Sequence, residues 1–294
     1  NTAIGHLAMQ ENTSGASNTA VGKKALFSST TASNNTGVGF NAGLSVTTGI
    51  QNALIGGQAG DALTDADFNV AVGTAALSSD TLGSRSTALG HATLFNQNFT
   101  SATDTYNVAV GYNAGQQVTT GVQNTLIGAL AGDALTDADT NVAIGVSALG
   151  GDTLGSSSVA IGSSALRLQN FTSATDVYNV AVGRGAGENV TTGKFNTLIG
   201  GLSGDALTDG QENVAVGYQA LTADTQGENS VAIGNNALFS QNGVNGNVFN
   251  VAIGKNAGFA ITTGVENVLI GGLAGDALTD ADFNVAIGKN ALAA

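Results

Sequence analysis

The stretch NVAVGYNAGQQVTTGVQ, residues 107–123, begins with the phrase that decides the fold: Asn, two small or β-branched residues, Val or Ile, then Gly. Seventeen copies of this phrase begin at residues 1, 18, 35, 52, 69, 86, 107, 124, 141, 158, 179, 196, 213, 230, 250, 267 and 284. The spacing is 17 residues, except for three steps of 21, 21 and 20. Such a period indicates a stacked repeat architecture, in which each unit contacts chiefly its neighbours.

The amino-acid composition limits which repeat architectures are possible. The 294 residues include no Trp, Cys or Pro, one Met and only 5% aromatic residues, so any core is thin and built from Val, Ile, Leu and Ala. Gly occurs 43 times without Pro, which excludes collagen. Because the repeat leaves no linker, we expect one elongated domain over residues 1–294.

Two positions of the repeat are almost invariant when each unit is numbered from its Asn. Position five is Gly in every copy, and a turn or a close backbone approach is expected there. Position eight is Ala in fifteen copies, where a neighbouring backbone is expected to crowd the side chain. We take these as structural positions, represented by Gly5, Gly22, Gly39, Gly111, Gly145, Gly183, Gly254, Ala114, Ala148 and Ala186.

The residues before the Gly predict a short strand. Positions two and four, such as Val108 and Val110, place a β-branched pair on one face, and an Asp at Ile144 is expected to disrupt this stacked apolar row. Helix is excluded by the obligatory Gly and by the content of Asn, Thr and Gly. The expected fold is all-β, a parallel β-solenoid of about 17 coils, with the Asn at position one stacked along the axis.

A longer order lies within the 17-residue period. Position nine alternates in pairs between Gly and a large apolar residue, so that the full repeat is four coils of about 72 residues. All three length increases lie in the fourth coil, at residues 94–106, 166–178 and 238–249. Insertions confined to one coil type are expected to project from one side of the solenoid.

The phrase SVAIG followed by polar residues and Ala-Leu, at Ser158–Leu166 and Ser230–Leu238, resembles the head repeats of YadA-like trimeric autotransporter adhesins. Similar arrays occur in phage tail-fibre and collar proteins. The resemblance covers the whole chain, and it implies a left-handed β-roll that packs as a homotrimer. The 17-residue coils are longer than usual for that family, and a neck, a heptad stalk and a membrane anchor are not seen.

The charge and the polar clusters exclude several functions. A net charge of −13 disfavours nucleic acid and anionic membranes, and the chain has no apolar membrane segment. Twelve of the 21 acidic residues gather in segments such as Asp133–Asp139, whose spacing is not that of an EF-hand, so solvated or structural turns are favoured over calcium sites. His6 and His91 are expected at the surface. We predict no catalytic, cofactor or metal site.

Aromatic residues in or beside the coil-four insertions are candidate contact residues, because exposed aromatics make good anchors. The alternative is that they fold each loop back over a coil edge. These residues are Phe99, Tyr106, Phe171, Tyr178, Phe239 and Phe249. Sequons at Asn12, Asn34, Asn98, Asn170 and Asn189 are expected by chance in a chain so rich in Asn and Thr.

The sequence therefore predicts a non-enzymatic extracellular or cell-surface fibre of the adhesin type, which displays loops for attachment to a host surface or extracellular matrix. One alternative is a phage tail-fibre or collar protein, located in the virion and used in host recognition. Another is a subunit of a filament that assembles end to end. The last unit stops after 11 of its 17 residues, and neither end carries an atypical capping repeat, which favours a piece of a longer fibre.

Overall fold

The computed structural model describes residues 1–243 and 246–293, and within them it contains only strands, turns and loops. The fold is a parallel β-solenoid of about 17 coils, as the period predicts. Its contacts divide the chain into two compact units, Asn1–Ala143 and Ile144–Ala294. The prediction of a single domain stays a prediction.

Each coil of the first unit contributes one three-residue strand at positions two to four. Successive strands pair in parallel and in register, for example Val108 with Thr125 and Val110 with Ile127. The strands are β1 (Thr2–Ile4), β2 (Thr19–Val21), β3 (Thr36–Val38), β4 (Ala53–Ile55), β5 (Val70–Val72), β7 (Thr87–Leu89), β9 (Val108–Val110) and β10 (Thr125–Ile127). The first insertion adds β6 (Gly83–Ser84) and β8 (Thr103–Asp104), which pair with each other.

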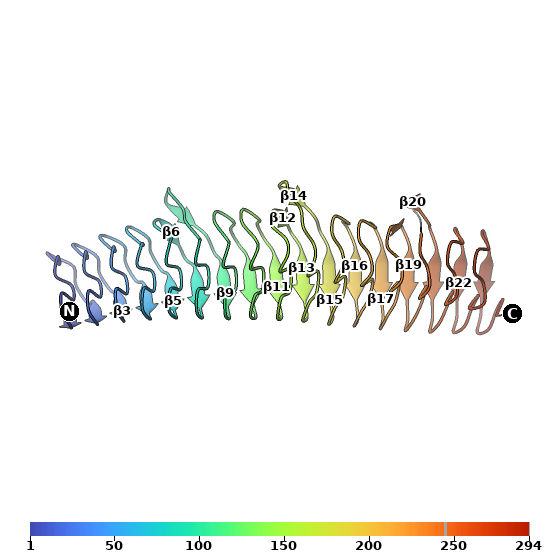
Figure 1. Cartoon of the computed structure of the whole chain (residues 1–294), viewed down its shortest axis with the longest axis horizontal. Coiled ribbons are helices and arrows are strands. Elements are labelled where there is room, and N and C mark those ends of the chain that lie inside the picture. The colour runs from blue at the N-terminus through green and yellow to red at the C-terminus, as the bar shows by residue number, and fades with distance from the viewer. Residues whose placement is uncertain (244–245, 294) are drawn as a thin grey trace. The chain divides into compact units, whose positions relative to one another are not determined.

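The second unit repeats this pattern, and β11 (Val142–Ile144) lies at the boundary between the units. Its strands are β13 (Val159–Ile161), β15 (Val180–Val182), β16 (Thr197–Ile199), β17 (Val214–Val216), β19 (Val231–Ile233), β21 (Val251–Ile253), β22 (Val268–Ile270) and β23 (Val285–Ile287). Two insertions add the pairs β12 (Gly155–Ser156) with β14 (Thr175–Asp176) and β18 (Gly227–Glu228) with β20 (Gly246–Asn247). Both insertions of this unit project from the same side, as their position in the repeat predicts (Figure 1).

Gly at position five is required by two independent constraints. Gly111 has a φ of 137°, which a residue with a Cβ rarely adopts, and the other six position-five glycines named above have φ values between 137° and 143°. A Cβ on Gly111 would also lie 2.5 Å from the carbonyl oxygen of Gly128 in the next coil. Coils stacked at the strand spacing therefore leave no room for a side chain at this turn.

The core is formed by position three, and the stacked row of β-branched residues at positions two and four lies outside it. Ala109 and Leu126 are fully buried, whereas positions two and four of the same strands are half-buried or exposed, and Ile144 is half-buried. The pair does share one face, but that face points outward. The narrow interior of the coil explains this arrangement. It accommodates Ala in most copies of position three, and the bulkier β-branched side chains lie outside.

Position eight completes this narrow core, as the repeat predicts. Ala114, Ala148 and Ala186 are fully buried. The backbone N–H of Ala148 donates to the carbonyl of Gly145 at 3.3 Å, and that of Ala186 donates to Gly183 at 3.2 Å. The small residue therefore closes the turn that the Gly begins.

The four-coil order arises from complementary volumes in the core. Leu126, at position three of a second coil, lies between the position-nine glycines Gly115 and Gly132. A Cβ on either glycine would lie 2.7 Å from a methyl group of Leu126. Leu149 and Leu94, in coils with Ala at position three, instead place the large side chain at position nine. The alternation of Gly and Leu therefore keeps the core filled without overlap.

The Asn at position one links neighbouring coils, as expected from its repetition. Oδ1 of Asn18 accepts from the backbone N–H of Asn35 at 2.8 Å, and Nδ2 of Asn18 donates to the carbonyl of Ala32 at 2.7 Å. In the second unit, Asn196 contacts Asn213 and Gly210 in the same way. Each buried amide thus satisfies backbone groups that the short strands leave unpaired.

Candidate functional site

A buried polar cluster holds the base of the first insertion. The Asp80 carboxylate is fully buried and accepts from the backbone N–H of Gly83 at 3.0 Å, from that of Phe99 at 3.1 Å, and from Nε2 of Gln97 at 2.6 Å. Gln97 also donates to Ser86 at 2.9 Å and accepts from Asn107 at 2.9 Å. We call the Asp, Gln and Ser of such a cluster a loop anchor.

The second unit contains two more loop anchors with the same contacts. Asp152 accepts from the N–H groups of Gly155 and Phe171 and from Gln169, which also contacts Ser158. Asp224, Gln241 and Ser230 form the third anchor. Burial raises the pKa of the Asp224 carboxyl, and the hydrogen bonds from Gln241, Gly227 and Gly243 oppose this rise. The donors therefore favour the charged form of Asp224 but offset only part of the desolvation.

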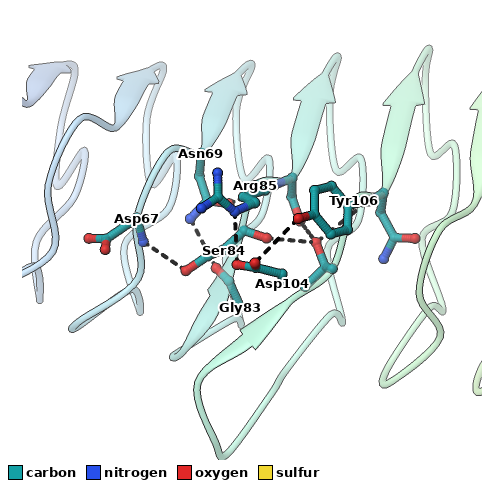
Figure 2. Close-up of polar contacts among 10 residues, drawn as sticks. Asp67, Asn69, Gly83, Ser84, Arg85, Asp104 and Tyr106 are labelled. Carbon is teal, nitrogen blue, oxygen red and sulfur yellow. Dashed lines mark hydrogen bonds and ion pairs between the residues drawn. The ribbon is translucent and has the colours of Figure 1, made fainter.

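Exposed groups lie over the base of the first insertion. Nε of Arg85 contacts Oδ1 of Asp104 at 2.9 Å, and the Tyr106 hydroxyl donates to Oδ2 of Asp104 at 3.3 Å (Figure 2). The Arg85 guanidinium also lies 4.7 Å from the centroid of the Phe68 ring. Ser84 accepts from the backbone N–H of Asp67 at 3.0 Å (Figure 2). The arrangement fixes the exposed side chains of β6 and β8 against the preceding coil.

The insertions of the second unit make different contacts with neighbouring coils. Tyr178, at the position of Tyr106, stacks on Phe195 with ring centroids 6.0 Å apart. Asn229, at the position of Arg85, donates to Asn247 at 2.5 Å. The three loops thus share their anchor, and the first two expose nearly the same side chains, but their contacts with the adjacent coils differ.

The six predicted contact residues divide into two groups. Tyr106, Tyr178 and Phe249, each the last residue of its coil, are about half exposed. Phe99 and Phe171 are buried, and Phe239 is half-buried and stacks on Phe259 at 5.0 Å. The first group is accessible to a partner, whereas Phe99 and Phe171 fold back onto the coil.

The acidic turns make structural hydrogen bonds. Oδ1 of Asp67 accepts from the backbone N–H of Ile50 at 2.7 Å, and Asp139 does the same for Val122 at 2.7 Å. Burial raises the pKa of both Asp133 and Asp205. Within residues 1–243 and 246–293, no three His, Cys, Asp or Glu side chains lie close enough together to hold a metal.

Exposed apolar side chains gather on and beside the strands. We call the outward residues of positions two and four, together with position six and the last residue of each coil, the strand surface. In the described part of the chain, all exposed large apolar residues except Leu168 and Leu292 belong to it. In the first unit they are Ile4, Phe40, Ile55, Phe68, Val70, Leu89, Tyr106, Tyr112 and Ile127.

The acidic residues have the opposite distribution. None of the 21 lies in the first nine positions of any coil, so the three-residue strands at positions two to four and the turns that follow them carry no negative charge. Glu212 and Glu266 are the acidic residues at the last position of a coil. The strand surface therefore has only these two acidic residues, and its exposed apolar side chains lie among five basic ones, Lys23, Arg85, Arg184, Lys255 and Lys289.

The loop anchors were not predicted from the sequence. A signal was present, because Asp80, Asp152 and Asp224 recur at position twelve of the third coil, and a Gln follows at position twelve of the fourth. The same fourth coils are those in which Ser replaces Asn at position one. Taken together, these three changes mark a polar core at the base of each insertion.

No membrane-spanning helix occurs in residues 1–243 or 246–293. Searches among protein families, curated proteins and solved structures found no match to this chain.

Proposed function

We propose that the chain is a non-enzymatic structural protein of an extracellular fibre, which associates with copies of itself through the strand surface and displays the coil-four loops for attachment. The copies form a homotrimer. The observation that carries the proposal is the segregation of exposed apolar residues onto the strand surface, since contiguous apolar patches are rare on monomeric proteins.

Charge supports a second copy as the partner of this surface. Two chains that each carry −13 repel one another, and the repulsion is smallest where neither presents acidic groups. The first nine positions of each coil meet this condition. A polar partner would leave the half-exposed Ile and Val residues of positions two and four without apolar contacts, whereas another strand surface buries them.

The loops provide the part of the molecule that interrupts the regular coils. The core rows and the Asn contacts repeat from coil to coil, whereas the exposed groups around Asp104, Asp176 and Asn247 occur only in the insertions. Binding residues are commonly found on loops that a rigid scaffold positions. The three buried anchors hold the loops while their tips remain available to a surface partner.

Sedimentation velocity of matched variants tests the self-association. Ile199, on the strand surface, and Leu168, outside it, are both 39% exposed. We expect the wild-type chain and Leu168→Glu to sediment at three times the 28.8 kDa chain mass, and Ile199→Glu to dissociate, with unchanged circular dichroism in all three. A monomeric wild-type chain, or equal behaviour of the two variants, would contradict the proposal.

A further inference from the structure

The structure separates the five sequons that the sequence treats alike. Asn98-Phe99-Thr100 and Asn170-Phe171-Thr172 occupy the same place in two coil-four insertions, directly after the Gln of the loop anchor. In both, the Asn and the Thr are exposed and the Phe between them is buried. The buried ring fixes the tripeptide so that the amide and the hydroxyl face solvent.

The orientation of the two amides is also fixed. Oδ1 of Asn98 accepts from the Thr81 hydroxyl at 3.1 Å, and Oδ1 of Asn170 accepts from Thr153 at 3.1 Å. No atom in the described part of the protein accepts a hydrogen bond from Nδ2 of Asn98 or Asn170. A group attached to Nδ2 would therefore extend into solvent and leave the Oδ1 hydrogen bond intact.

The other sequons lack this presentation. Nδ2 of Asn12 is buried, and Nδ2 of Asn189 donates to the carbonyl of Asp205 at 2.8 Å. Asn34 is the last residue of its coil and Thr36 lies in β3, so this sequon is part of the strand surface. A bulky group at Asn12 would displace a buried atom, at Asn189 it would compete with an existing hydrogen bond, and at Asn34 it would obstruct the proposed association.

We propose that Asn98 and Asn170 are acceptor sites for N-linked glycans. An Asn-x-Thr tripeptide on a surface loop is the substrate of this modification in secreted proteins. The donor class is a lipid-linked oligosaccharyl diphosphate. Nδ2 forms a bond to C1 of the sugar, the C1–O bond breaks, the lipid diphosphate leaves with the electron pair, and an amide proton passes to a base of the transferase.

The third insertion provides an internal control. Asn242 is exposed, and its Oδ1 accepts from Thr225 at 2.9 Å, as at the two proposed sites. The sequence there is Asn242-Gly243-Val244, which lacks the hydroxyl required two residues after the Asn. The geometry of the Asn is thus kept while the recognition signal is absent.

Secretion of the full chain from cultured eukaryotic cells, with a tag that carries an established acceptor sequon, tests the proposal. Peptide mass spectrometry after enzymatic release in ¹⁸O-labelled water is expected to convert Asn98 and Asn170 to labelled Asp, and to leave Asn242 unchanged. Thr100→Ala should abolish the label at Asn98 alone. Unmodified Asn98 and Asn170 in a secreted chain with a glycosylated tag and unchanged circular dichroism would overturn the proposal.

The inference rests on the proposed extracellular function, but the two can fail separately. Chain made in the bacterial cytoplasm carries no N-linked glycan and reports self-association alone. A trimer without glycans on the secreted chain would overturn only the modification. A glycosylated monomer would overturn only the proposed association.

Discussion

The distance between neighbouring coils determines which residue types individual positions of the coil can hold. Gly111 has a backbone conformation and a neighbouring carbonyl that exclude any Cβ, and Ala114 is fully buried beside it. Position three is restricted in a different way, because its side chain enters a space that position-nine residues of its own coil and of the preceding coil also occupy. The repetition of these residues is thus a consequence of stacking geometry.

Leu126 and Ile127 provide a direct test of which residues face the core. In the Ile199→Glu background, which removes the proposed self-association, Leu126→Ala should lower the free energy of unfolding by about 2–5 kcal/mol because it leaves a cavity. Ile127→Ala, whose side chain is 36% exposed, should lower it by roughly 1 kcal/mol or less. Urea unfolding of both variants measures the difference, and equal losses would refute the inward orientation of position three.

Asp224 gives a prediction for the dependence of stability on pH. Because burial raises its pKa in the folded state above the ordinary value of 3.8, the folded chain binds the proton more tightly than the unfolded chain. The contribution of this group to the free energy of unfolding is fully present below pH 3.8 and is lost as the pH rises through the pKa of the folded state. The stability of the wild type relative to Asp224→Asn should therefore fall with rising pH, then level off, in urea titrations. A relative stability that increases over the same range would contradict this account.

At the scale of the element, each insertion is attached to the solenoid by its buried anchor and not by its exposed contacts. Arg85 and Asp104 pair at the surface of the first loop, where an ion pair adds little. The Asp80 carboxylate, by contrast, accepts three hydrogen bonds in full burial, two of them from loop residues. Loss of an anchor is consequently expected to release the loop.

Gln169 and its neighbour Leu168 allow this expectation to be measured. Gln169→Ala removes donors to Asp152 and Ser158 and leaves the buried carboxylate short of a partner, at a cost of about 1–3 kcal/mol or more. We expect faster hydrogen exchange at the amide of Phe171, which donates to Asp152. Leu168→Ala, at an exposed neighbouring position, should leave that exchange rate unchanged. Identical protection of Phe171 in both variants would show that the anchor does not hold the loop.

The solenoid could be predicted from sequence because its period is regular and its Gly and Asn positions have single geometric explanations. Which side chains point inward could not be predicted from the sequence. A Val-Ala-Val strand can turn either its Val residues or its Ala toward the core until the width of the coil is known. Leu126 and Gly115 belong to successive coils, and their complementary volumes are visible only when the coils are stacked. The loop anchors were missed for the same reason: Asp80 and Gln97 are 17 residues apart and meet across neighbouring coils.

At the scale of the whole molecule, the distribution of charge and apolar surface indicates how copies meet. All acidic residues lie at position ten or later in their coils, while the exposed Ile and Val side chains follow the strands. We therefore expect strand surfaces to be covered in the assembled protein and the coil-four loops to face solvent. Such an arrangement lets one repetitive chain provide both a stable scaffold and several points of attachment.

Electron cryo-microscopy of the assembled protein tests this arrangement most directly, because it locates every surface at once. We predict three copies whose strand surfaces face one another, with residues 98–104 and 170–176 of the insertions on the outside. Particles in which the strand surfaces face solvent, or in which the insertions form the contacts between copies, would contradict the account.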